Sequence, residues 1–301
     1  VVSLIFWTLF LRTETKAKEP ILDPQVFQNR TFLMIILAGL MSNFGLTALM
    51  VYYTLFLQGV QGISATQSGQ ILTPFGVLMA FVGVPTGFLL ARTKRYKWLF
   101  VMSYGIVAAV LIGTIFFRAD TPMLWNFVIT TVGGLGFGAV PTIKTIVVQS
   151  IVPKRLLGVA TGALFFTVSL GLTISPAILG SIMNMAYENK LKTVLPGELK
   201  QVANSASMNS IGNPRVLLSK PALKLLENDL KNAGMNAPLI FEKTVQAIRT
   251  SMEAGLRMVF IIGAAGMLLA FFLIMTIPEV SMDAEVEDKR VSEKVPAAAS
   301  P

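Results

Sequence analysis

Two residue types that could carry out chemistry are absent from this chain. Its 301 residues contain no cysteine and no histidine. This excludes thiolate nucleophiles, imidazole bases and the usual thiolate or imidazole metal ligands. Between Thr31 and Tyr187 the single acidic residue is Asp120, so no pair of carboxylates can be assembled in that stretch for hydrolysis. We therefore expect no enzyme activity, no metal site and no cofactor.

One cation lies inside a long apolar segment. Lys144 is about two helical turns from the end of that segment. Ionisable groups are costly inside a membrane and are functional candidates for that reason. Two interpretations remain open: Lys144 lines a water-filled cavity, or its ammonium group extends along the helix to the membrane interface.

Polar residues recur at helical spacing in two apolar segments. With 3.6 residues per turn, each set falls on roughly one face of a helix. Such faces suit the wall of a substrate cavity, although hydrogen bonds between neighbouring helices would use the same residues. The candidate cavity residues are Asn43, Thr47, Met50 and Thr54 in the first set, and Asn126, Thr130, Phe137, Pro141 and Lys144 in the second.

Small residues four positions apart are concentrated between Gly133 and Gly180. They let helix backbones approach closely in a membrane, where no hydrophobic effect drives helices together. Prolines in the same stretch can bend a helix. The residues expected to pack or bend helices are Gly134, Gly138, Gly158, Gly162, Gly171, Ser175 and Pro176, with Pro141 also inside its segment.

The composition predicts the environment of these segments. The chain is 53% hydrophobic and 14% charged with a mean hydropathy of +0.67, whereas a soluble domain is about 25% charged. We predict an all-α polytopic membrane protein, because about 20 apolar residues span a bilayer. The six predicted spans are 32–57, 68–91, 98–117, 123–150, 158–186 and 256–277, within a bundle covering 31–277.

The net charge of +9 reports on orientation and not on a nucleic-acid partner. Basic connectors at 12–30, 92–97 and 151–157 alternate with poorly charged ones at 58–67 and 118–122. Cytoplasmic loops carry the excess of Lys and Arg, so we expect the basic connectors inside. The C-terminus is then cytoplasmic, in a disordered tail at 278–301, and the loop at 187–255 lies outside.

Helical patterns are also expected in that outer loop. Ser219, Pro221, Leu223, Leu226, Leu230 and Gly234 have the spacing of a capped amphipathic helix, and 240–252 is a second helical run that leads into the last span. At the other end, Val1–Leu11 is apolar but too short to cross a bilayer. We interpret 1–30 as the end of a linker helix and a connector, and the chain as part of a longer protein.

The succession of several motifs resembles the C-terminal half of a major facilitator superfamily transporter, most of all the fourteen-helix drug:proton antiporter family. The motifs are Val26-Phe27-Gln28-Asn29-Arg30-Thr31-Phe32, Tyr53-Thr54-Leu55-Phe56-Leu57-Gln58, Gly134-Leu135-Gly136-Phe137-Gly138, Val152-Pro153-Lys154-Arg155 with Gly158-Val159-Ala160-Thr161-Gly162, and Pro278-Glu279. The resemblance implies a six-helix C-terminal bundle that works with an N-terminal half of the same polypeptide. Spans 32–57 and 123–150 would line a central cavity, and 68–91 and 158–186 would face the other bundle.

Gly87, Arg92 and Arg95 resemble a repeat of the superfamily's cytoplasmic loop signature. Ala91 stands where that signature has its Asp, and Lys94 where it has Gly. A charge-relay role for this copy is therefore weakened, and the two arginines may instead anchor the loop.

The resemblance implies a function in the cell membrane: efflux of hydrophobic drugs or other small molecules, coupled to protons and achieved by alternating access. Export of one specific metabolite or siderophore is the alternative within the same fold. A seven-helix receptor is a further alternative, but it would require Val1–Leu11 to be a complete span. The 301 residues alone would hold half of a cavity, and we expect no transport from them in isolation.

Overall fold

The computed structural model describes residues 24–195 and 237–278 without a break, together with Thr8, Arg12, Thr13 and short pieces at 211–214, 216–219, 221, 223–225 and 227–228. Three expectations fall outside the described residues, wholly or almost so. They concern the linker helix at 1–11 apart from Thr8, the residues Leu226, Leu230 and Gly234 of the outer helix, and the tail after Pro278.

Six helical spans of the described chain are long and apolar enough to cross a membrane, which confirms the all-α polytopic fold. The first consists of α3 (Arg30–Thr47), η1 (Ala48–Tyr52), α4 (Tyr53–Leu55) and η2 (Phe56–Val60), and the second of α5 (Ala65–Phe81) and α6 (Gly83–Thr93). The other four are α7 (Lys97–Ile115), α8 (Met123–Ile151), α9 (Leu157–Val194) and α13 (Ala237–Met275). Short helices are α2 (Pro24–Gln28), η3 (Lys154–Leu156) and η4 (Val216–Leu218).

The helix ends follow from local sequence. Asn29 caps α3 by accepting a hydrogen bond from the Phe32 amide at 3.2 Å. Ser64 and Gln67 form a reciprocal capping box at the start of α5. Between α5 and α6 the helix is interrupted at Val82, three residues before Pro85, which has no N–H to donate to the carbonyl of Phe81.

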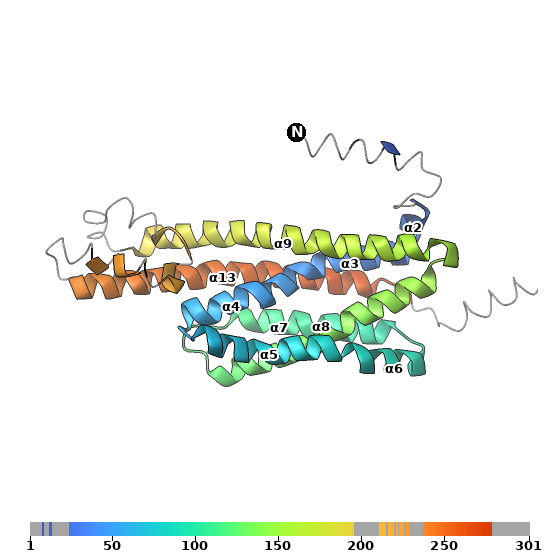
Figure 1. Cartoon of the computed structure of the whole chain (residues 1–301), viewed down its shortest axis with the longest axis horizontal. Helices are drawn as coiled ribbons and strands as arrows, with labels where there is room; N and C mark the ends of the chain where they lie inside the picture. The colour runs from blue at the N-terminus through green and yellow to red at the C-terminus, as the bar shows by residue number, and fades with distance from the viewer. Residues whose placement is uncertain are drawn as a thin grey trace, which may run out of the picture.

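The spans form two packed groups (Figure 1). Helix α13 packs against α3 and α9, while α8 packs against α5 and α7, and contacts between α13 and α7 join the groups. Burial is uneven: 61% of the most apolar part of the first span is buried, against 17% for α5–α6 and 22% for α9. The second and fifth spans therefore present most of their surface to whatever surrounds the bundle.

Helices α9 and α13 run side by side beyond the other spans at the left of Figure 1. They contain 38 and 39 residues, about 57 Å each at 1.5 Å per residue, whereas the hydrocarbon core is about 30 Å thick. Both ends of the expected outer loop at 187–255 are thus helical, and the run 240–252 is part of α13. The Tyr187 hydroxyl donates to the carbonyl of Ile211 at 2.6 Å and ties the segment after α9 to it.

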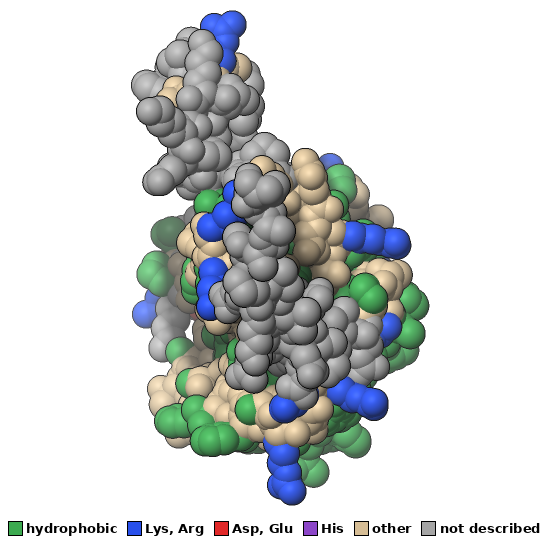
Figure 2. Space-filling view, turned by 90° about the vertical axis from the view of Figure 1, so that its right-hand side faces the viewer, with side chains coloured by type: hydrophobic (Ala, Val, Ile, Leu, Met, Phe, Trp, Pro, Cys, Tyr) green, Lys and Arg blue, Asp and Glu red, His purple; other side chains and the backbone are tan. Residues whose placement is uncertain are grey.

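The three basic connectors meet at the opposite end of the bundle, whose surface carries Lys and Arg side chains (Figure 2). Hydrogen bonds join them there: Asn29 Nδ2 donates to the Ile151 carbonyl at 3.3 Å, and Arg155 donates to Gln25 at 2.8 Å. The Tyr96 hydroxyl, next to the 92–97 connector, donates to the Pro278 carbonyl at 2.8 Å. The start of the first span and the end of the last therefore lie at the basic end.

Candidate functional site

A cavity of about 230 Å³ lies among α3, α5, α8 and α9. Its lining is mostly apolar, with a few polar groups from α3 and α8. The lining residues are Ser42, Asn43 and Leu46 from α3, Met79 from α5, Phe137, Val140, Pro141, Lys144 and Thr145 from α8, and Leu164, Phe165, Val168 and Leu172 from α9. An apolar cavity with a small number of placed polar groups is the usual form of a small-molecule site.

Lys144 is the charged residue of this cavity. Its side chain is only 7% exposed, and its Nζ lies 6.0 Å from the centre of the Tyr104 ring. A Cβ atom at Gly39 would be 3.1 Å from Nζ, so the ammonium group reaches across to α3 where that helix has no side chain. The described residues place no carboxylate within ion-pair distance of it. Lys144 thus lies in the bundle interior and does not extend along α8 to the helix end.

Asn43 occupies the α3 side of the cavity. Its amide donates to the carbonyl of Gly39 at 2.8 Å, and the neighbouring Ser42 hydroxyl donates to the same carbonyl at 2.9 Å. A Cβ atom at Gly171 would lie 2.6 Å from Asn43 Cγ. Gly171 therefore lets α9 approach α3 at the level of Asn43, as the small-residue spacing predicts.

The rest of the first polar stripe turns away from the cavity. Thr47 is buried but is not among the lining residues, and Met50 is 44% exposed. Thr54 donates to the carbonyl of Met50 at 2.9 Å. The cause is the π-helix η1 at Ala48–Tyr52, because a π turn holds more residues than an α turn and rotates everything after it out of the original face.

The second stripe is divided as well. Asn126 and Thr130 are buried at the end of α8 remote from the basic connectors, where the Tyr53 hydroxyl donates to Asn126 Oδ1 at 2.7 Å and Asn126 Nδ2 donates to Gln61 at 2.8 Å. Thr130 donates to the carbonyl of Ile71 at 2.7 Å. These two residues tie α8 to the first two spans. Only the later part of the stripe lines the cavity.

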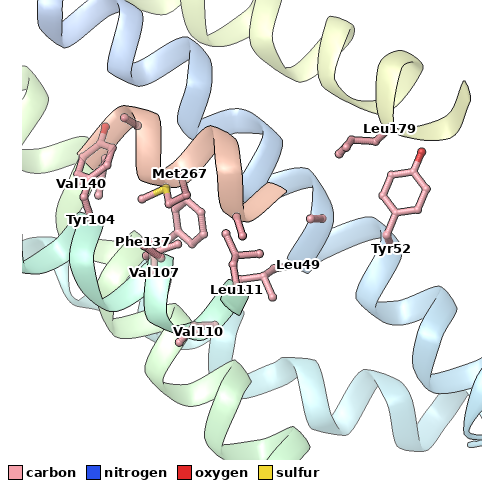
Figure 3. Packing of buried hydrophobic residues seen from close by; sticks show 14 of the residues in the cluster. Leu49, Tyr52, Tyr104, Val107, Val110, Leu111, Phe137, Val140, Leu179 and Met267 are labelled. Atoms are coloured by element: carbon pink, nitrogen blue, oxygen red, sulfur yellow. The ribbon is translucent and has the colours of Figure 1, made fainter. Parts of the chain in front are cut away.

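That later part holds Phe137, Pro141 and Lys144. Phe137 is 4% exposed and meets Phe75 of α5 edge to face at 5.9 Å between ring centres. Figure 3 shows Phe137 and Val140 beside Tyr104 and Met267, so the cavity wall is continuous with the buried core. Pro141 is exposed and adds no hydrogen-bond donor to the wall.

The predicted small residues differ in their surroundings. A Cβ at Gly134 would lie 2.8 Å from the Phe75 backbone, and one at Gly138 would lie 2.6 Å from the Leu78 carbonyl, so α8 packs directly on α5 there. Cβ atoms at Gly158 and Gly162 would meet nothing within 4 Å.

The remaining two lie where α9 meets the first span. Ser175 is fully buried, and its hydroxyl has no hydrogen-bond partner among the described residues. The carbonyl of Pro176 accepts a hydrogen bond from the Tyr52 hydroxyl at 3.0 Å.

The residues of the loop signature lie at the basic end. Arg92 and Arg95 are exposed, and a Cβ at Gly87 would be 3.8 Å from the Thr142 side chain of α8, an ordinary contact. Lys94 ends α6 with a φ of 53°, in the left-handed region. This is the position at which the resembling signature has glycine, and glycine adopts that conformation without strain.

A second, more polar cavity was not predicted. It has a volume of about 460 Å³ and lies at the end remote from the basic connectors. Its lining includes Tyr52 and Leu55 of the first span, Gly180, Met183, Asn184 and Glu188 of α9, and Gly212, Asn213 and Pro214. The spacing of 180, 184 and 188 along α9 was the available signal, since residues four apart share a helix face.

Comparison with known proteins identifies the family. The Major Facilitator Superfamily profile matches residues 1–176, more than half of the chain. Multidrug transporter protein MdtP of Bacillus subtilis is 29% identical over 281 residues, covering 90% of this chain and 51% of MdtP. A tetracycline resistance determinant of Streptomyces rimosus is 25% identical over 291 residues, covering 92% of this chain and 80% of that protein. The chain spans about half the length of MdtP and of B. subtilis Multidrug resistance protein 3, at 51% and 46%.

A solved structure shows the same fold. The crystal structure of a bacterial homologue of the human lysosomal transporter Spinster, in an inward-facing and occupied conformation, matches with a TM-score of 0.54 at 18% identity. The match covers 82% of this chain and 50% of that one. Because members of the superfamily are transporters, the expectation that the chain is not an enzyme is confirmed. The chain belongs to the Major Facilitator Superfamily and is a multi-pass membrane protein of that transporter family.

Proposed function

We propose that the chain is one of the two helix bundles of a proton-coupled efflux transporter for hydrophobic small molecules. The observation that carries the proposal is the cavity among α3, α5, α8 and α9. Two of its walls, α5 and α9, belong to the two spans with the smallest buried share, 17% and 22%. A site bounded by the least covered helices is suited to completion by a second bundle.

The surface of α9 supports a second bundle as the partner. Phe165 and Leu172 line the cavity and are 60% and 48% exposed. The open positions at Gly158 and Gly162 on the same helix would let another helix approach closely. We assign the second bundle to an N-terminal half of the same polypeptide, in keeping with relatives about twice the length of the match.

The lining supports hydrophobic substrates. Aromatic and aliphatic side chains such as Phe137 and Leu164 form most of the cavity surface, and such sites discriminate weakly among apolar molecules. The relatives named for multidrug and tetracycline resistance favour drug efflux. Export of a single metabolite or siderophore is the narrower alternative.

Proton coupling would depend on the second bundle. Asp120 is the single acid between Thr31 and Tyr187, and it lies in a connector. We therefore place the proton-carrying carboxylate in the other half, with the two bundles rocking about the cavity. The basic end, the C-terminus and the loop with Arg92 and Arg95 would face the cytoplasm of a cell membrane.

The test is drug-dependent proton movement in everted membrane vesicles that contain the complete gene product. A respiration-driven proton gradient is monitored with a quenched acridine dye while hydrophobic drugs are added. We expect several chemically unrelated drugs to collapse the gradient partly and to compete with one another. Phe137→Ala should weaken the response, and Phe166→Ala, at a position on α9 that is 42% exposed and does not line the cavity, should not. Absence of any response across a broad panel would contradict the proposal, and a response to one compound alone would favour the specific exporter.

A further inference from the structure

The Lys144 ammonium group is the feature that the proposed efflux of hydrophobic molecules leaves unexplained. It is 93% buried, faces a cavity and has no carboxylate partner among the described residues. An ionised group without a partner is expensive to bury in a protein interior. Its nearest favourable contact is the face of the Tyr104 ring at 6.0 Å, a distance at the limit of a cation–π interaction.

The sequence around Lys144 offers it no anion. The acidic residues of the described spans and connectors near the cavity are limited to Asp120, which lies between α7 and α8 at the far end of the bundle. On α3, the amides and hydroxyls closest to Lys144 are committed elsewhere, since Asn43 and Ser42 both donate to the carbonyl of Gly39. The cation is therefore available to a ligand in the cavity.

The geometry of the remaining wall limits what that ligand can be. Phe137, Leu164 and Phe165 supply an apolar surface beside the ammonium group. Within so small a cavity, about 230 Å³, a ligand that satisfies both must carry its negative charge at the edge of a compact hydrophobic body.

We propose that Lys144 selects small hydrophobic anions as substrates, with a carboxylate or a similar acidic group bound to Nζ and the apolar part against Phe137 and α9. The inference rests on the proposed function, because it names the substrate class of the same cavity. Organic cations would be disfavoured there, since no group in the cavity would balance Lys144 once it is shielded from water.

The experiment uses the complete gene product, purified in detergent, and the ligand pair 1-pyrenebutyrate and its neutral N-methylamide. The two share one hydrophobic body and differ in charge. Binding is followed by pyrene fluorescence at neutral pH, for the native protein and for Lys144→Met, Lys144→Arg and Lys154→Met. Lys154 is an exposed lysine of the connector before α9 and serves as the matched control.

We expect the native protein to bind the acid at least about tenfold more tightly than the amide, as a charge-assisted contact in a buried site implies. Lys144→Met should abolish this preference and leave the affinity for the amide within about twofold. Lys144→Arg should retain most of the preference, and Lys154→Met all of it. Elution as a single species in size-exclusion chromatography shows that each variant is folded, and Lys144→Gln replaces Lys144→Met if the latter aggregates.

Two results would overturn the inference. One is equal binding of acid and amide by the native protein, and the other is an unchanged preference in Lys144→Met and Lys144→Gln. Transport of both ligands in vesicles without any dependence on Lys144 would leave the efflux function standing and remove only the charge selection. Selective binding of the acid without transport of any compound would do the reverse.

Discussion

The close packing of α8 on α5 at Gly138 leads to a prediction with a defined magnitude. A Cβ atom at Gly138 would lie 2.6 Å from the Leu78 carbonyl oxygen, 2.8 Å from Val82 Cβ and 3.1 Å from Met79 Cα. Two of these atoms are backbone, so no flexible side chain can yield, and α5 itself must move away by several tenths of an ångström. Overpacking of this kind costs about 1–3 kcal/mol.

Alanine also favours the helical state relative to glycine by about 1 kcal/mol. Gly138→Ala should therefore lower the free energy of unfolding of the bundle by about 1–2 kcal/mol, the difference between the two effects. Gly162→Ala is the matched control, because its Cβ would meet nothing within 4 Å. That variant keeps the gain in helix propensity and should be at least as stable as the native chain.

The assay is denaturant- or heat-induced unfolding of the purified protein in one detergent, with the native chain, Gly138→Ala and Gly162→Ala measured side by side. A stability for Gly138→Ala equal to that of Gly162→Ala would refute the reasoning, since the two differ only in what surrounds the added methyl group.

Three further predictions concern other contacts. Lys94→Gly should stabilise the protein by up to about 1 kcal/mol because Lys94 has a φ of 53°, whereas Lys97→Gly at the start of α7 should destabilise it; thermal unfolding of both variants tests this, and equal effects would contradict it. Asn126→Ala should cost about 2–3 kcal/mol, because it leaves the buried Tyr53 hydroxyl without its 2.7 Å partner, yet it should leave the ratio of acid to amide binding unchanged. Gly162→Trp should reduce transport in vesicles by more than tenfold by obstructing the approach of the second bundle while the α3–α13 bundle keeps its thermal stability; normal transport would argue against docking on that face of α9.

The fold was accessible from sequence because hydropathy reports directly on membrane spans. The apolar runs predicted six spans, and the structure has six helices of suitable length. The far ends of α9 and α13 were not accessible in this way, since residues such as Glu188 and Lys190 are polar and hydropathy cannot separate a helix outside the membrane from a loop.

The cavity was only partly accessible. Asn43, Phe137, Pro141 and Lys144 line it, and these are the members of the two stripes that helical periodicity keeps together. The others depart for reasons that periodicity does not contain. The π turn at 48–52 breaks the face of α3, and Asn126 is engaged by Tyr53, a residue far away in sequence.

The glycines illustrate a related limit. The pairs at 134 and 138 and at 158 and 162 have the same spacing, yet one pair packs against α5 and the other has no neighbour among the described residues. Spacing shows that a face can accept a close helix, and only the arrangement of all six spans shows whether this chain supplies that helix. The open pair therefore became an argument for a second bundle.

The most direct test of substrate binding in the cavity uses single cysteines, since the 301 residues contain none. Thr145 lines the cavity and donates to a carbonyl four residues earlier at 3.0 Å, and Thr54 makes the same type of bond at 2.9 Å but lines neither cavity. Thr145→Cys and Thr54→Cys, each in a cysteine-free version of the complete protein, are labelled with a thiol-reactive reagent in membrane vesicles. We predict that transported compounds slow labelling at 145 and leave labelling at 54 unchanged. Transport of the same compounds with equal labelling rates at 145 in their presence and absence would contradict the assignment of this cavity as the substrate site.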